Sequence, residues 1–355
     1  LVMQTPLPHT QSTQAPPPHV IFHVGMAKTG TTSIQYFFRE NYEKALELGL
    51  LYPRAGASNN GLAHHSWHKT FSAEKRAVVD DWISEGDAPA MLEQLEAEIL
   101  EHSPRKLLFS SESFQPNSIA RLLASIPHRH ATVLFFLRRA DHLLEAQYAQ
   151  GIKTGRHKMS PDQFLDHALV TRPQWLHPHG LLAGYAALDA DLVIQPFERQ
   201  QLGPTLVRRF LELVGMEAMA ALETEVAENE RLHPLLTQLL AARHDEERLI
   251  GGKYVALRRH LNEILAKTKD GIPSSFFSPR QRRMILDEAA GDYRSIAEEL
   301  MGRRPGELFL EPLPDINAPW HPPPALTVSD TADLLLGLWD AVWAERQGNR
   351  QKGSA

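Results

Sequence analysis

The chain contains no cysteine among its 355 residues. This absence excludes disulfide bonds, thiolate-bound zinc, iron–sulfur clusters and a cysteine nucleophile, and it is typical of a protein that works in a reducing compartment. The sequence also lacks a run of about 18 consecutive apolar residues, so we expect no transmembrane segment. Together these two absences favour a cytoplasmic location.

Positive charge is scarce as well. The chain has 37 Lys and Arg residues against 43 Asp and Glu residues, which gives a formal net charge of -6. A chain with this balance has no overall positive field with which to hold a nucleic acid, so we expect no nucleic-acid partner. Hydrophobic residues make up 43% of the sequence, which is enough for a globular core and excludes wholesale disorder. Any site for an anion must therefore be local.

Short apolar segments alternate with amphipathic ones along the first two-thirds of the chain. The apolar segments, which read as buried strands, are 19–24, 106–111, 132–138 and 191–197. The segments with helical spacing between and beside them are 31–49, 89–102, 174–188 and 204–214, and a polar helix is expected from Asp141. This alternation predicts an α/β fold with a central, mainly parallel sheet, right-handed crossovers and helices on both faces.

The remainder of the chain has a different character. Beyond residue 230 the pattern is almost entirely helical, over about 233–268, 279–301 and 329–346, with proline-rich breaks at 312–324. The first residues are polar and proline-rich, without the basic start and apolar core of a signal peptide. We therefore expect a disordered leader over 1–18, an α/β core over 19–230, and a helical C-terminal lobe over 231–355 that packs on the core.

The most informative segment is the turn between the first strand and the first helix, Gly25 to Thr32, with the sequence GMAKTGTT. Glycines in such a turn let the backbone approach a ligand closely, and the N–H groups at the start of a helix converge on an anion that the helix dipole also favours. The Thr and Ser hydroxyls that follow can add donors. This context predicts a phosphate-binding loop.

The loop differs from that of nucleotide-hydrolysing enzymes, which reads G-x-x-x-x-G-K-[ST]. Thr31 stands where that pattern has lysine, and Lys28 precedes Gly30 by two residues. The other central strands lead into Ser-Ser-Glu and Arg-Arg, so a well-placed aspartate for magnesium is missing. We therefore expect no metal site, and a P-loop kinase or NTPase is the alternative prediction.

The segment VGMAKTGTTSIQ resembles the 5′-phosphosulfate loop of sulfotransferases that use 3′-phosphoadenosine 5′-phosphosulfate (PAPS), particularly the K-T-G-T-T form of bacterial and carbohydrate-acting members. The resemblance implies the three-layer, P-loop-type α/β fold of that family. It also implies that Lys28 reaches the oxygen that bridges phosphate and sulfuryl group. The implied cofactor-binding residues of the loop are Lys28, Thr29, Gly30, Thr31, Thr32 and Ser33.

A second landmark agrees in part. In the family, a strand ending in Arg leads to a helix with a Ser eight residues later, and the two side chains hold the 3′-phosphate of the cofactor. The segment TVLFFLR supplies Arg138, but position 146 is Ala. The resemblance thus implies a 3′-phosphate site that retains Arg138 and lacks the hydroxyl, and with the looser similarities it spans about residues 19–310.

Sulfuryl transfer needs a base to take the proton of the acceptor. Glu112 follows the strand 106–111, and the carboxyl ends of parallel strands face the ligand. His65 and His64 are the competitors, because imidazole titrates near neutrality. We rank Glu112 first, His65 second and His64 third.

These features predict a metal-independent sulfotransferase that moves the sulfuryl group of PAPS to a hydroxyl or amine and releases 3′-phosphoadenosine 5′-phosphate (PAP). The acceptor is expected to be a carbohydrate or a small molecule, and the sequence leaves its identity and the oligomeric state open. Besides the kinase or NTPase, a non-catalytic nucleotide-binding protein with this fold is an alternative, which Ala146 favours.

Overall fold

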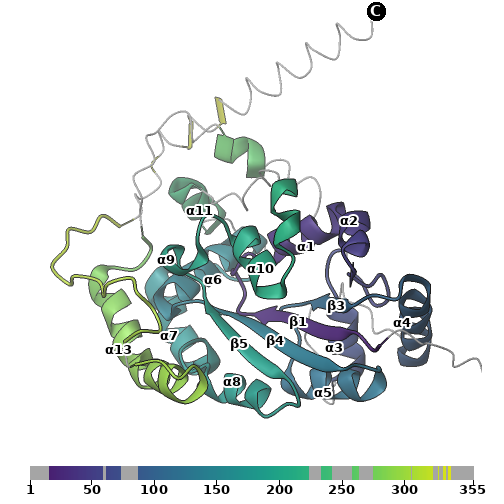
Figure 1. Ribbon diagram of the computed structural model, residues 1–355. Coiled ribbons are helices and arrows are strands. Elements are labelled where there is room, and N and C mark those ends of the chain that lie inside the picture. The colour runs from purple at the N-terminus through teal and green to yellow at the C-terminus, as the bar shows by residue number, and fades with distance from the viewer. Residues whose placement is uncertain are drawn as a thin grey trace, which may run out of the picture.

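A parallel sheet forms the centre of the protein (Figure 1). The computed structural model describes residues 16–58, 61–72, 87–223, 233–241, 258–263, 275–304 and 306–322, together with 327, 331, 332, 335 and 336. The five strands, in the spatial order β2-β3-β1-β4-β5, are β1 (His19–Gly25), β2 (Leu50–Leu51), β3 (Lys106–Ser110), β4 (His130–Leu137) and β5 (Asp191–Pro196). Their pairings are all parallel, which confirms the predicted α/β class.

Helices cover both faces of the sheet and complete three layers (Figure 1). One face packs against α1 (Thr31–Glu40), α2 (Tyr42–Glu47) and α10 (Leu206–Val214). The other face packs against α3 (His65–Phe71), α4 (Ala88–His102), α5 (Pro116–Ser125) and α8 (His179–Ala186). Because both faces are covered, the strands read as continuous apolar runs rather than as an alternating pattern.

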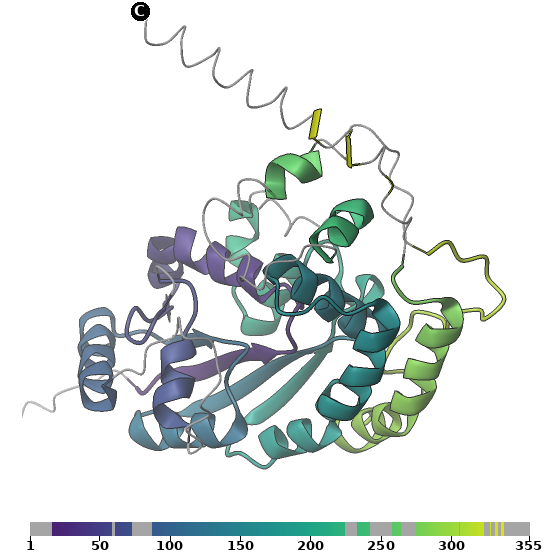
Figure 2. The ribbon, with the colours of Figure 1, turned by 180° about the vertical axis from the view of Figure 1, so that it is seen from behind.

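A further cluster of helices lies beside the sheet. It contains α6 (Ala140–Thr154), α7 (Pro161–Thr171) and α13 (Pro279–Ser295). Figure 2 shows the yellow-green α13 beside the teal helices of this cluster. The shorter elements are η1 (Pro173–Trp175), α9 (Arg199–Leu202), η2 (Glu217–Leu222), α11 (Pro234–Ala241) and the π-helical turn η3 (Ile296–Leu300). None of the helices in the described ranges has the length and apolar character needed to cross a membrane.

Local signals explain where the sequence interpretation and the structure differ. The predicted helix 31–49 is two helices, because Asn41 ends the first: its backbone and side-chain N–H groups both donate to the carbonyl of Phe37, at 3.0 and 2.9 Å. The predicted helix 174–188 divides at Pro178 into η1 and α8. Strand β2 and helices α3, α5, α7 and α9 were not predicted.

The described C-terminal elements are helical, as predicted. Ile285 and Ala289 of α13 pack against Leu144 and Tyr148 of α6, which attaches this part of the chain to the core. Most of the predicted helix 329–346 and residues 1–15 of the predicted leader lie outside the described residues. The division between core and lobe at residue 230 stays a prediction.

A buried ionic cluster fixes the segment that follows η3. The carboxylate of Asp141, fully buried, accepts hydrogen bonds from Arg139 Nε at 2.8 Å and Arg282 Nη2 at 2.6 Å. Burial opposes ionisation of Asp141, but the hydrogen bonds and charge of Arg139 outweigh it and hold its pKa below the usual value. Arg139 also donates to the backbone carbonyl of Glu311 at 3.0 Å. Arg139 therefore has a structural role, whereas its neighbour Arg138 turns to the loop described next.

Candidate functional site

The glycine-containing loop Gly25 to Gly30 leaves the carboxyl end of β1, the central strand. The hydroxyl of Thr29 donates to the carbonyl of Met26 at 2.7 Å, and this bond closes the loop on itself. Lys28 has φ 69° and Gly30 has φ 75°, both in the left-handed region. That conformation is uncommon for a residue with a side chain, and such residues cluster at functional sites. At Gly30 a Cβ would also lie 2.2 Å from Cδ2 of Leu206, so any other residue would be strained by its backbone and would have to displace that side chain.

The amino terminus of α1 follows directly on this loop. Gly30 is the N-cap, so no side chain caps the helix, and the first turn contains no acidic residue. The Thr31 side chain is buried, and its hydroxyl faces the Glu112 carboxyl, whose pKa it lowers. Backbone N–H groups at the start of a helix and the helix dipole together suit a phosphate or sulfate group. The residues present therefore fit the 5′-phosphosulfate end of PAPS.

The Lys28 side chain reaches across the loop toward α6. Its Nζ donates to Oε1 of Gln150 at 2.7 Å. Burial lowers the pKa of Lys28, and the charges of Lys153, Arg138 and Arg156 lower it further, while Glu112 opposes them. Lys28 thus lies in a basic environment with one acidic neighbour.

Arg138 lies directly beside the loop. Gly25 of β1 pairs with Phe136 of β4, so the residue two positions beyond Phe136 is level with the turn. The guanidinium donates to the backbone carbonyl of Lys28 and lies over the ring of Phe197, with Cζ 5.5 Å from the ring centroid. Arg138 therefore supports the loop as well as adding positive charge to it.

Glu112 follows β3, which lies on the opposite side of β1 from the strand β4 that precedes Arg138. β3 pairs with β1 through Ser110 and His23, which brings the residues after β3 beside the loop. The Glu112 side chain is accessible to solvent, yet protein surrounds it so closely that desolvation raises its pKa; Thr31 and Lys28 act in the opposite direction. A carboxylate with a raised pKa next to a cation has the character of a general base.

The two histidines have different surroundings. His64 is fully buried; its Nδ1 accepts from the backbone N–H of Ser110 at 3.0 Å, and its Nε2 is 2.8 Å from the carbonyl of Pro53. Burial lowers its pKa to about 4. Because both nitrogens are committed to the backbone, this arrangement argues against His64 as the base. His65 Nδ1 lies 2.6 Å from Oγ of Ser111 and 3.2 Å from Oγ of Ser113.

Two residues at the end of α6 and just beyond it, Lys153 and Arg156, were not predicted as part of the site, whereas Gln150 was expected beside the 3′-phosphate. Gln150 contacts Lys28 directly, and the other two contribute to the charge around it. The spacing Ala146, Gln150, Lys153 repeats at four and then three residues, which places them on one face of a helix. This spacing is the signal by which the sequence could have indicated them.

The structure therefore brings Lys28, Glu112, Arg138 and the loop residues Thr29 to Ser33 together at the carboxyl ends of β1, β3 and β4. His65, at the start of α3, contacts the serines on either side of Glu112, and His64 lies in the core. The roles assigned to these residues stay predictions. The described residues contain no group of three or more His, Asp or Glu side chains placed to hold a metal ion, and metal independence also stays a prediction.

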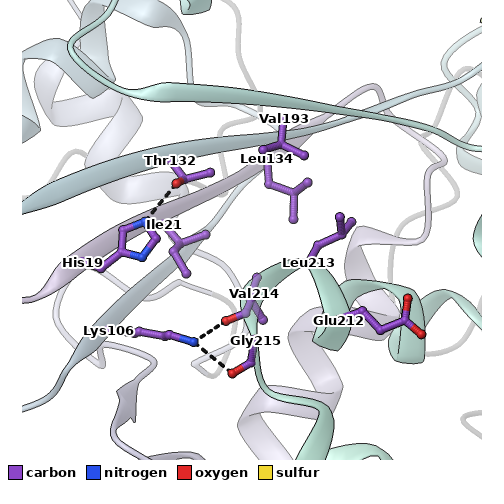
Figure 3. Close-up of a pocket in the computed structure, with 10 residues that line it drawn as sticks. All are labelled: His19, Ile21, Lys106, Thr132, Leu134, Val193, Glu212, Leu213, Val214 and Gly215. Atoms are coloured by element: carbon purple, nitrogen blue, oxygen red, sulfur yellow. Dashed lines mark hydrogen bonds between the residues drawn. The ribbon is translucent and has the colours of Figure 1, made fainter. Parts of the chain in front are cut away.

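A hollow of about 330 Å³ lies toward the other end of the strands, where its lining includes His19 and Lys106, the first residues of β1 and β3 (Figure 3). Its floor includes Ile21, Leu134 and Val193 from three strands. At its rim, Lys106 Nζ donates to the carbonyls of Val214 and Gly215 at 2.6 and 2.9 Å. Lys106 thus stabilises the carboxyl end of α10, a common role for a lysine at a helix terminus. The hollow is separate from the loop residues.

No family model and no curated protein matches this chain. Among solved structures, the chain is similar to a sulfotransferase from Alicyclobacillus acidocaldarius, with 15% sequence identity and a TM-score of 0.46. The similarity covers 82% of this chain and 98% of the other.

Proposed function

We propose that this chain is a PAPS-dependent sulfotransferase that transfers a sulfuryl group to a hydroxyl or amine of a carbohydrate or small molecule. The observation that carries the proposal is the loop at the end of β1. It presents Lys28 and the uncapped start of α1 between a carboxylate on one side, Glu112, and a guanidinium on the other, Arg138. This set supplies positive charge, backbone donors and a base around one point.

PAPS, when bound, would supply the sulfuryl group and a nucleotide phosphate as leaving group. The N–H groups of α1 and the Thr31 hydroxyl would hold the phosphosulfate end. Lys28 would stabilise the negative charge that develops on the departing phosphate oxygen, and Glu112 would accept the proton of the acceptor hydroxyl or amine. Since Lys28 is bonded to Gln150, an anion at the loop would compete with the Gln150 amide for its ammonium group.

Arg138 is the proposed contact to the 3′-phosphate. We expect Arg138→Ala to bind PAP about 10- to 150-fold more weakly, since a hydrogen bond to a charged group contributes about 1.5 to 3 kcal/mol. Ala146→Ser should strengthen PAP binding by adding a hydroxyl. Calorimetric titration with PAP and with adenosine 5′-phosphate, which lacks the 3′-phosphate, measures both effects.

Arg283→Ala is the matched control, because Arg283 lies on α13 and its side chain pairs with Asp287 instead of the loop. It should leave both affinities unchanged. If the parent protein bound the two nucleotides equally well, α6 and the end of β4 would not form a 3′-phosphate site.

Two measurements separate this proposal from its alternatives. A kinase or NTPase should prefer ATP to PAP in the same titration and should need magnesium for turnover. A non-catalytic nucleotide-binding protein should bind PAP but fail to move labelled sulfate from PAPS onto any acceptor in a panel of sugars, phenols and amines. The cytoplasmic location and the absence of a nucleic-acid partner stay predictions from composition.

A further inference from the structure

The turn that carries Glu112 is held from one side by His65. Nδ1 of His65 lies between the hydroxyls of Ser111 and Ser113, at 2.6 and 3.2 Å. These two serines flank Glu112 in the sequence. The Ser111 hydroxyl also accepts a hydrogen bond from the Ser113 backbone N–H at 3.0 Å, which closes the turn around Glu112.

The backbone before this turn is fixed independently. Ser111 N–H donates to the carbonyl of His23 at 3.0 Å, extending the pairing of β3 with β1 by one residue. His64 accepts from Ser110 N–H through its ring and donates its own N–H to the carbonyl of Ser110 at 2.9 Å. The position of the main chain up to Ser111 is therefore set by strand and core, and the hydroxyls on either side of Glu112 meet at His65.

The hydrogen atoms around the Ser111 hydroxyl can be placed consistently. Because the Ser111 oxygen already accepts from Ser113 N–H, its own proton is available to His65 Nδ1. In that arrangement Nδ1 is an acceptor and the ring proton is on Nε2. Nδ1, the ring nitrogen that faces the turn around Glu112, then accepts a hydrogen bond from the Ser111 hydroxyl.

We propose that His65 is a positioning residue that fixes the turn Ser111 to Ser113 and so aims the Glu112 carboxylate at the loop. The proposal rests on the proposed function for its effect on turnover. It replaces the prediction that His65 competes with Glu112 as the base: the two would act in series, with His65 acting only through Glu112. The group next to the aimed carboxylate on the loop is Lys28, with Thr31 at the start of α1.

The proposal predicts different turnover for two substitutions of His65. His65→Ala removes the acceptor and should lower kcat by about 10- to 100-fold, because a misplacement of about 1 Å at a reacting group can cost on that order. The KM for PAPS should change little. His65→Asn places an amide oxygen near the position of Nδ1 but cannot titrate, so it should recover most of the lost turnover.

His68→Ala is the matched control, since His68 lies one turn further along α3 and its Nδ1 is 3.2 Å from the Ser118 hydroxyl, away from Glu112. It should keep kcat within a few-fold of the parent. If His65→Asn were as inactive as His65→Ala and lost an ionisation near neutral pH, His65 would be the base and the proposal would be overturned.

A second readout does not depend on catalysis. The titration of the Glu112 carboxyl can be followed by carbon-13 NMR, with the signal assigned by its loss in Glu112→Gln. The carboxyl should titrate above the usual glutamate range in the parent and in His65→Asn, and shift toward that range in His65→Ala as the turn loosens. An unchanged titration in His65→Ala would refute the positioning role, whereas a parent protein without sulfotransferase activity would refute only the proposed function.

Discussion

Replacing Lys28 by alanine should lower kcat by about 30- to 900-fold, or about 2 to 4 kcal/mol in the barrier, which is the effect of losing one preorganised charged group at the reacting centre. The lysine is held at the loop by left-handed backbone and by its bond to Gln150, so its position is fixed before a ligand binds. PAP lacks the transferred group, and its binding should weaken less than turnover. Steady-state kinetics with PAPS and calorimetry with PAP measure the two quantities.

Lys44→Ala provides the control for this substitution. Lys44 is an exposed residue of α2 that pairs with Glu47 at 2.7 Å, and its loss removes the same charge from the chain without touching the loop. Its turnover should match that of the parent. A Lys28→Ala enzyme that kept turnover within a few-fold would exclude Lys28 from the transition state.

Glu112→Gln should reduce kcat by roughly 10²-fold or more, because the amide keeps the shape of the side chain but cannot accept a proton. PAP binding should be retained. Glu98→Gln is a suitable comparison: Glu98 on α4 accepts from the backbone N–H groups of Arg54 and Ala55, and it lies on a helix that does not carry site residues. Normal turnover in Glu112→Gln, together with an inactive His65→Asn, would assign the base to the histidine.

The pH profile gives an independent check on Glu112. A carboxylate base is active when deprotonated, so kcat should fall as the pH drops through its pKa and lose about tenfold per unit below it. Desolvation raises this pKa above the ordinary value of 4.5, which moves the acidic limb to higher pH than an exposed glutamate would give. Glu112→Gln should abolish this limb, and its persistence would attribute it to another group.

The local sequence was enough to predict most strands of the sheet and the position of the glycine-containing loop. Buried parallel strands are continuous apolar runs, and β1, β3, β4 and β5 were all recognisable as such. The two-residue strand β2 was not, because Leu50 and Leu51 are too few to show a period. The break at Asn41 was missed for a related reason: apolar spacing continues through it, and only the side-chain bond to Phe37 reveals the helix end.

Contacts between distant segments distinguish candidate residues that look equivalent in the sequence. In the sequence, His64 and His65 are adjacent and chemically identical. In the structure, His64 lies in the core with both ring nitrogens at backbone groups, and His65 lies at the turn of Glu112. Arg138 and Arg139 divide in the same way, one to the loop and the other to Asp141.

The sequence by itself determined the α/β class and the position of the loop from Gly25 to Gly30, because a strand, a glycine turn and a helix start are local properties of consecutive residues. Tertiary structure decided that Gln150, Lys153 and Arg156 surround Lys28 and that His65 contacts the turn of Glu112, since these contacts join residues separated by between 46 positions, from His65 to Ser111, and 128 positions, from Lys28 to Arg156. Such contacts depend on strand order and helix packing. These bring distant side chains to the carboxyl ends of the strands and produce no periodic pattern in the sequence.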